Sequence, residues 1–237
     1  MELLLEKPVI IEFNGLPATG KSTIANELIS ILHNRRINCV RSYVKHKWQT
    51  NGYTVFLSLK MIRLHLLLNR FAKSIIPRKG RTTHIMGEMY HFRSCYDFLR
   101  SNGSPKVLVV DQGLIQSIVS IAHLDKIEEM ESLRQVLNFY REKGITFFCV
   151  NCAVNPQLSC DRINNRPDNT ARMHKVPESE LLSAMIMQAA NIILVRKIFA
   201  EELPIDVIEV DTTLTPSENA NFILNKLIVD GFITTKH

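Results

Sequence analysis

The chain has 237 residues, of which 46% are hydrophobic, so it can bury one sizeable core, and we expect one domain over residues 1–237. Its formal net charge of +6 excludes a strongly acidic class and points to anionic ligands. The five cysteines include one lone Cys-x-x-C, Cys149 to Cys152, inside an apolar run, which disfavours a metal or redox site.

We expect no targeting signal in the amino-terminal segment. The first motif starts at Gly15, and Leu3 to Leu5 is too short for the apolar part of a secretory signal. We therefore expect a cytoplasmic protein.

The most specific motif is Gly-x-x-x-x-Gly-Lys-Ser at residues 15–22, between the apolar run 8–13 and a helix-patterned stretch. In such a loop the backbone amides surround the α/β-phosphates, the lysine reaches the β/γ-phosphates and the serine ligates Mg²⁺. The predicted ATP-binding residues are Gly15, Leu16, Pro17, Ala18, Thr19, Gly20, Lys21, Ser22 and Thr23. The alternative is a glycine turn with a surface lysine, which the flanking strand and helix patterns disfavour.

Five short apolar runs are typical of buried parallel strands that alternate with helices. They are Pro8 to Phe13, Cys39 to Val44, Val107 to Val110, Ile145 to Val150 and Ile205 to Val210. The last predicted helix has Thr215 as its N-cap, Pro216 at its first position and Glu218 closing a capping box.

The stretch between Leu28 and Gly87 contains twelve Lys or Arg residues and no acidic residue, whereas the rest of the chain has a net charge of −6. This distribution favours anions, although solvated basic faces, or a membrane-surface or nucleic-acid patch, are alternatives. Within it, residues 53–76 are rich in leucine, but Lys60 and Arg63 interrupt them, so no transmembrane segment is expected. The spacing suits a core helix or one that faces a partner, and a homodimer is one candidate.

Asp111 follows the apolar run 107–110 directly. A buried strand of this kind delivers a carboxylate to its carboxyl end, beside the phosphate loop. We expect Asp111 and Ser22 to hold Mg²⁺, directly or through water. A turn or helix N-cap is the alternative for Asp111, which Gln112 and Gly113 would also permit.

A helix is predicted to start at Asn155-Pro156 and to present Arg162 and Arg166 on one face before Pro167 ends it. Together with Arg172 these arginines form a predicted lid over residues 161–176, which could close over bound nucleotide and stabilise the transferring phosphoryl group. The alternative is a helix whose arginines pair with Asp161 or Asp168.

In this arrangement the chain resembles the P-loop nucleoside and nucleotide kinases, and thymidylate kinase most closely. The resemblance implies the three-layer α/β fold of P-loop NTPases, with a five-stranded parallel sheet in the order 2-3-1-4-5, flanked by helices. It also implies an acceptor side at residues 45–105, in which Arg93 holds the acceptor phosphate, and an adenine site near residues 211–213.

Two departures from the thymidylate kinase pattern concern the acceptor. Asp111 is followed by Gln112 rather than by arginine, and Lys45-His46-Lys47 replaces the usual acidic motif after the second strand. Deoxynucleoside kinases use a carboxylate at that second position as a base for a sugar hydroxyl, whereas a phosphate acceptor needs no base. The nearest remaining carboxylate is Glu88, which we assign to the acceptor site with Arg93; a surface role at the amino terminus of a helix is the alternative.

The leading hypothesis is an ATP- and Mg²⁺-dependent kinase of a small phosphorylated acceptor, most simply a nucleoside monophosphate. The predicted catalytic residues are Lys21, Asp111, Arg162, Arg166 and Arg172. One alternative is a kinase of a neutral hydroxyl acceptor, with Glu88 or Asp111 as base. Another is a nucleotide-dependent module that binds nucleic acid or a membrane. A GTPase is disfavoured because no Asn-Lys-x-Asp motif follows the fourth strand.

Overall fold

The computed structural model describes residues 2–5, 9–42, 66, 107–111, 113–119, 131–141, 147–166, 176–203 and 205–236, and the statements below concern these residues. Three predicted site residues, Glu88, Arg93 and Arg172, lie outside this set, as do Lys45 to Lys47. The predicted acceptor region 45–105 and the predicted helix 53–76 also lie outside it, apart from Leu66.

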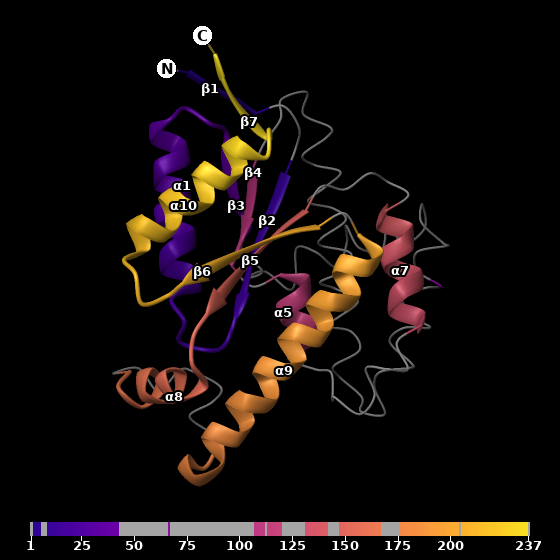
Figure 1. Cartoon of the computed structure of the whole chain (residues 1–237), viewed down its shortest axis with the longest axis vertical. Helices are drawn as coiled ribbons and strands as arrows, with labels where there is room; N and C mark the ends of the chain where they lie inside the picture. Colours follow the sequence, from indigo (N-terminus) through magenta and orange to yellow (C-terminus); the bar gives the residue numbers. More distant parts are fainter. Residues whose placement is uncertain are drawn as a thin grey trace, which may run out of the picture.

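The centre of the molecule is a five-stranded sheet in the order β3-β4-β2-β5-β6, in which every neighbouring pair is parallel (Figure 1). The strands are β2 (Val9–Gly15), β3 (Cys39–Ser42), β4 (Val107–Val110), β5 (Phe147–Ala153) and β6 (Ile205–Asp211). When these five strands are numbered along the chain, their order is 2-3-1-4-5. The predicted P-loop NTPase fold is therefore confirmed by the topology.

Helices cover both faces of the sheet and make a three-layer fold (Figure 1). Helices α1 (Lys21–Asn34) and α10 (Pro216–Val229) lie on one face, and α5 (Leu114–Val119) and α9 (Glu178–Glu202) lie on the other. Helix α7 (Glu131–Arg141) packs against α9, and α8 (Pro156–Asn164) follows the carboxyl end of β5. Because side chains alternate along a strand, Ile10 faces the α5 and α9 layer while Ile11 faces α1 and α10.

The same alternation separates the two cysteines of the Cys-x-x-C sequence. Cys149 belongs to the core under α5 and α9, and Cys152 belongs to the core under α1 and α10. Burial is the main reason that the pKa of each thiol rises to about 12. The two sulfurs therefore lie on opposite faces of the sheet and do not form one redox or metal site.

The strand ends differ from the sequence-based ones by a few residues. Strand β5 continues beyond Val150, where the apolar run stops, because Asn151 pairs with Asn14 on one side and with Glu209 on the other. The predicted caps of α10 are present, with Thr215 and Glu218 forming a reciprocal capping box.

Helix α8 starts as predicted, with Asn155 as its N-cap, but it ends at Asn164. Arg166 therefore follows the helix instead of sharing its last turn with Arg162. The amide of Arg166 donates to the carbonyl of Ile163, three residues earlier, which is the tighter turn that often closes a helix.

Two features were not predicted. Strand β1 (Glu2–Leu5) pairs antiparallel with β7 (Ile233–Lys236), so the two ends of the chain lie side by side (Figure 1). Among the described residues, α9 is the one helix that is long and apolar enough to cross a membrane by length and composition. Core helices pass the same test, and α9 packs against α5, α7 and α8.

Candidate nucleotide-binding site

The predicted phosphate loop leaves β2 through Gly15 and enters α1 through Gly20. Gly15 has a φ of 146°, and a Cβ at this position would lie 2.7 Å from the carbonyl oxygen of Cys152 on β5. Gly20 is the N-cap of α1 and has a φ of 82°. Both positions favour glycine, which explains the spacing of the two glycines in the motif.

Lys21 curls back over this loop. Its ammonium donates to the carbonyl oxygens of Gly15 at 3.1 Å and Leu16 at 2.6 Å, and to Thr19 Oγ1 at 3.3 Å. The pKa of Lys21 is lowered to about 8, mainly because the side chain is buried; Cys152 and Asp111 act to raise this pKa, and the charge of Arg166 acts to lower it. The structure thus brings the charges of Lys21, Asp111 and Arg166 into one electrostatic neighbourhood.

The amino terminus of α1 lies beside this lysine. Its first turn contains no acidic residue. The amides of the first turn of a helix have no partner within the helix, and they point toward an anion bound there. Ser22 and Thr23, at the start of α1, are both exposed, as binding to a ligand requires.

The side chain of Thr19 has a different role from the one predicted for the loop as a whole. It is buried, and its hydroxyl donates to the carbonyl of Leu16 while accepting from Lys21. It therefore supports the shape of the loop from inside.

Asp111 lies directly beyond β4, as predicted, and it forms an ion pair that the sequence did not reveal. Arg41 Nη2, from the neighbouring strand β3, lies 2.7 Å from Asp111 Oδ2, and both side chains are largely buried. The same guanidinium also donates to Asn26 on α1. Arg41 therefore links the end of β3 to both α1 and Asp111.

The donor set at this end of the sheet fits Mg²⁺. Mg²⁺ usually keeps several waters and takes only one or two protein oxygens together with phosphate oxygens. Ser22 and Asp111 would supply one hydroxyl and one carboxylate, and the second carboxylate oxygen of Asp111 has no hydrogen bond among the described residues. Within that part of the chain no group of three His, Cys, Asp or Glu could form a closed metal cage.

A buried series of hydrogen bonds beneath the loop was also not predicted from the sequence. The amide of Gly15 donates to Gln116 Oε1 at 3.2 Å, and the amide of Gln116 donates to Glu12 Oε1 at 3.1 Å. Glu12 is only 1% exposed. Its signal in the sequence was an acidic residue inside the apolar run of β2, which is a costly position for a charge without partners.

Helix α8 lies against the loop and carries the predicted lid arginine Arg162, and Arg166 follows its end. Arg162 donates to the hydroxyl of Thr212 at 3.3 Å and to its carbonyl at 3.0 Å, so it is held on the turn between β6 and α10. That turn is the segment which the kinase resemblance assigns to adenine. Arg166 is exposed beyond the helix, and its charge acts on Lys21.

No protein-family model matches the chain, and no curated protein matches it. Among solved structures it is similar to deoxyadenosine kinase from M. mycoides with the products dCMP and a flexible dCDP bound, at 15% identity and a TM-score of 0.45, over 92% of this chain and 97% of that chain. It is also similar to the same kinase with bound dATP, at 16% identity and a TM-score of 0.45, over 92% and 98%.

Proposed function

We propose that the protein is an ATP- and Mg²⁺-dependent phosphotransferase whose acceptor is a small phosphorylated molecule, most simply a nucleoside monophosphate. The observation that carries this proposal is the position of Lys21. Its ammonium lies within the curled loop at the start of α1, in the electrostatic neighbourhood of Asp111 and Arg166. This combination of one cation, a helix amino terminus and an adjacent carboxylate suits a triphosphate with its metal ion.

The roles of the residues follow from their places. The amides of the loop and of the first turn of α1 bind the phosphates. The first amide of the loop, that of Gly15, is held from below by Gln116, to which it donates. Lys21 exchanges its bonds to the loop carbonyls for bonds to phosphate oxygens. Arg166 neutralises charge on the transferring group, with Arg172 proposed for the same task. Ser22 and Asp111 would hold Mg²⁺, which supplies charge neutralisation at the phosphates when bound.

The acceptor class is inferred from charge. After β3 the sequence has Lys45-His46-Lys47 in place of a carboxylate, and the whole stretch between Leu28 and Gly87 contains no acid. An anionic acceptor needs positive charge and no general base. Arg93 is the proposed partner of the acceptor phosphate, with Glu88 nearby in the sequence. We further infer a cytoplasmic enzyme, because the reaction needs ATP and Mg²⁺.

The test is a panel of acceptors. Purified protein is mixed with ATP, Mg²⁺ and, in separate reactions, nucleosides, nucleoside monophosphates or short oligonucleotides, and ADP formation is measured. We expect ADP formation that depends on a monophosphate and is abolished by Lys21→Ala. Dependence on a nucleoside would instead support a neutral hydroxyl acceptor. Hydrolysis that is independent of acceptor, with salt-sensitive retention of oligonucleotide, would reject the kinase function in favour of a binding module.

A further inference from the structure

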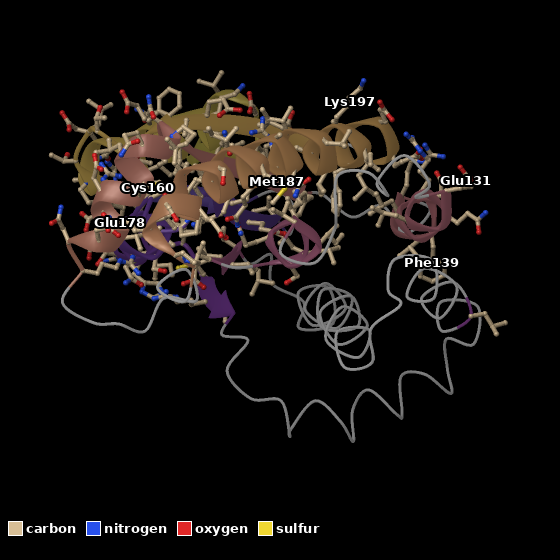
Figure 2. The ribbon with its side chains drawn as sticks, turned by 90° about the horizontal axis from the view of Figure 1, so that it is seen from below. Glu131, Phe139, Cys160, Glu178, Met187 and Lys197 are labelled. Atoms are coloured by element: carbon tan, nitrogen blue, oxygen red, sulfur yellow. The ribbon has the colours of Figure 1, made fainter. Side chains whose placement is uncertain are left out.

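Ser159 connects helix α8 to the phosphate loop. Its side chain is completely buried, and its hydroxyl donates to the carbonyl oxygen of Pro17 at 2.6 Å. Met185 on α9 lies beside the same hydroxyl, with 3.6 Å between Ser159 Oγ and the sulfur. Figure 2 shows α8, marked by Cys160, next to the amino-terminal end of α9, marked by Glu178, in agreement with the contacts between these helices.

This bond completes a series along the loop. The carbonyls of Gly15 and Leu16 accept from Lys21, and the next carbonyl, that of Pro17, accepts from Ser159. Three successive carbonyls are thus held by side-chain donors. When the carbonyls of a curled loop are held on one side, its amides are free to converge on an anion on the other.

Ser159 is five residues before the end of α8 at Asn164, and Arg166 follows that end by two residues. Arg162, three residues after Ser159, is bonded to Thr212 on the turn after β6. Helix α8 is therefore fixed at two points, by Ser159 on the phosphate loop and by Arg162 on this turn. The place at which the chain leaves the helix, and so the place of Arg166, depends on both contacts.

We propose that Ser159 is a positioning residue that fixes α8 on the phosphate loop, so that Arg166 faces the terminal phosphate of a bound nucleoside triphosphate. The proposal rests on the nucleotide binding proposed above but not on the identity of the acceptor. Its consequence is selectivity: the protein prefers ATP to ADP partly because Ser159 holds Arg166 in place. The electrostatic interaction between Arg166 and Lys21 agrees with this placement.

The test compares the affinities for ATP and ADP, each with Mg²⁺, by calorimetry and without turnover. The proteins are the wild type, Ser159→Ala, Arg166→Ala and the double variant. The matched control is Ser183→Ala, because Ser183 also donates to a backbone carbonyl, that of Glu180, but is exposed on α9. Ser159→Cys keeps a side chain of similar shape with a weak hydrogen-bond donor, and it serves as a second variant if the alanine variant does not fold.

We expect Ser159→Ala to reduce the preference for ATP over ADP by about tenfold, which is typical of losing one charge-assisted contact, with ADP affinity nearly unchanged. Arg166→Ala should reduce the preference for ATP by a similar factor, and the double variant should reduce it no further than either single variant. Ser159→Cys should reduce the preference by an intermediate factor, and Ser183→Ala should leave it unchanged.

Three results would overturn the proposal: an unchanged preference in Ser159→Ala and Ser159→Cys, an equal loss of ATP and ADP affinity in them, or additive losses in the double variant. An equal loss would mean that Ser159 supports only the loop. If the wild type binds neither nucleotide, the proposed function fails as well, and this result differs from nucleotide binding whose selectivity does not depend on Ser159.

Discussion

Arg41 and Asp111 form an ion pair of 2.7 Å across the carboxyl ends of β3 and β4. The two residues are 70 positions apart in sequence, and the pair lies beside the predicted magnesium site. One carboxylate oxygen is thereby occupied by a guanidinium, which fixes the direction in which the other oxygen can accept a ligand. The pair therefore ties the geometry of the proposed metal ligand to the neighbouring strand.

The first prediction concerns Asp111 itself. Asp111→Asn removes the negative charge that Mg²⁺ needs, so the Mg²⁺ concentration for half-maximal ATP binding should rise by about tenfold or more. It is measured by titrating Mg²⁺ at fixed ATP. Asp161→Asn is the control, because Asp161 is exposed on α8 and its carboxylate bonds only with the side chain of Gln157 in the described structure. An unchanged Mg²⁺ requirement would remove Asp111 from the metal site.

The second prediction concerns the stability of the pair. Arg41→Ala leaves a largely buried carboxylate without its cation and should lower the free energy of unfolding by about 1–3 kcal/mol. In urea unfolding, the double variant Arg41→Ala/Asp111→Asn should lose less free energy of unfolding than the two single variants lose in sum. Arg35→Ala, on the exposed end of α1, should change stability by less than about 0.5 kcal/mol. Strict additivity would show that the ion pair does not contribute to folding.

The third prediction concerns Gly113, which lies against Glu12. A Cβ at Gly113 would lie 2.4 Å from Glu12 Cδ, and Glu12 is buried and bonded to the amide of Gln116. Gly113→Ala should therefore lower stability by about 1–3 kcal/mol, as overpacking does. It should also weaken ATP binding, because a shift of Glu12 and Gln116 disturbs the hydrogen bond that the amide of Gly15 donates to Gln116. The comparison is Gly231→Ala, where nothing lies within 4 Å and only the backbone conformation opposes the change. Wild-type stability and ATP affinity in Gly113→Ala would contradict this account.

The fourth prediction concerns pH. The pKa of Lys21 is about 8 in the free protein, mainly because the side chain is buried. A bound triphosphate favours the ammonium, so the complex keeps this proton to higher pH than the free protein does. Binding then takes up a proton, and ATP affinity should fall as pH rises above about 8, by up to tenfold per pH unit.

Calorimetry in two buffers of different ionisation enthalpy measures this proton uptake directly. Lys21→Met removes the titrating group and should make the remaining affinity insensitive to pH in the same range. An equal pH dependence in the wild type and in Lys21→Met would exclude Lys21 as its source.

The local parts of the site could be predicted from sequence because each is encoded within a few residues. The motif from Gly15 to Ser22 sets the loop, and an apolar run that ends in Asp111 places that carboxylate at the edge of the sheet. The strand order followed from the kinase resemblance. The capping box of α10 and the N-cap of α8 were predictable for the same local reason, since a cap involves only the first turn of its helix.

The contacts between distant segments could not be predicted. Arg41 was only one of twelve basic residues, and nothing local distinguishes it until β3 and β4 are paired in register. Ser159 is an ordinary helical serine until α8 is placed against Pro17. Strands β1 and β7 are four residues each, too short to recognise without the partner at the other end of the chain.

The transfer of a labelled γ-phosphate from ATP tests the central claim most directly, because it separates phosphoryl transfer from hydrolysis. The wild type is incubated with γ-labelled ATP, Mg²⁺ and a nucleoside monophosphate, and the products are separated, with Lys21→Ala in parallel. The proposed function predicts label in a nucleoside diphosphate with the wild type and none with Lys21→Ala. Label released only as inorganic phosphate, at the same rate with and without acceptor, would contradict it.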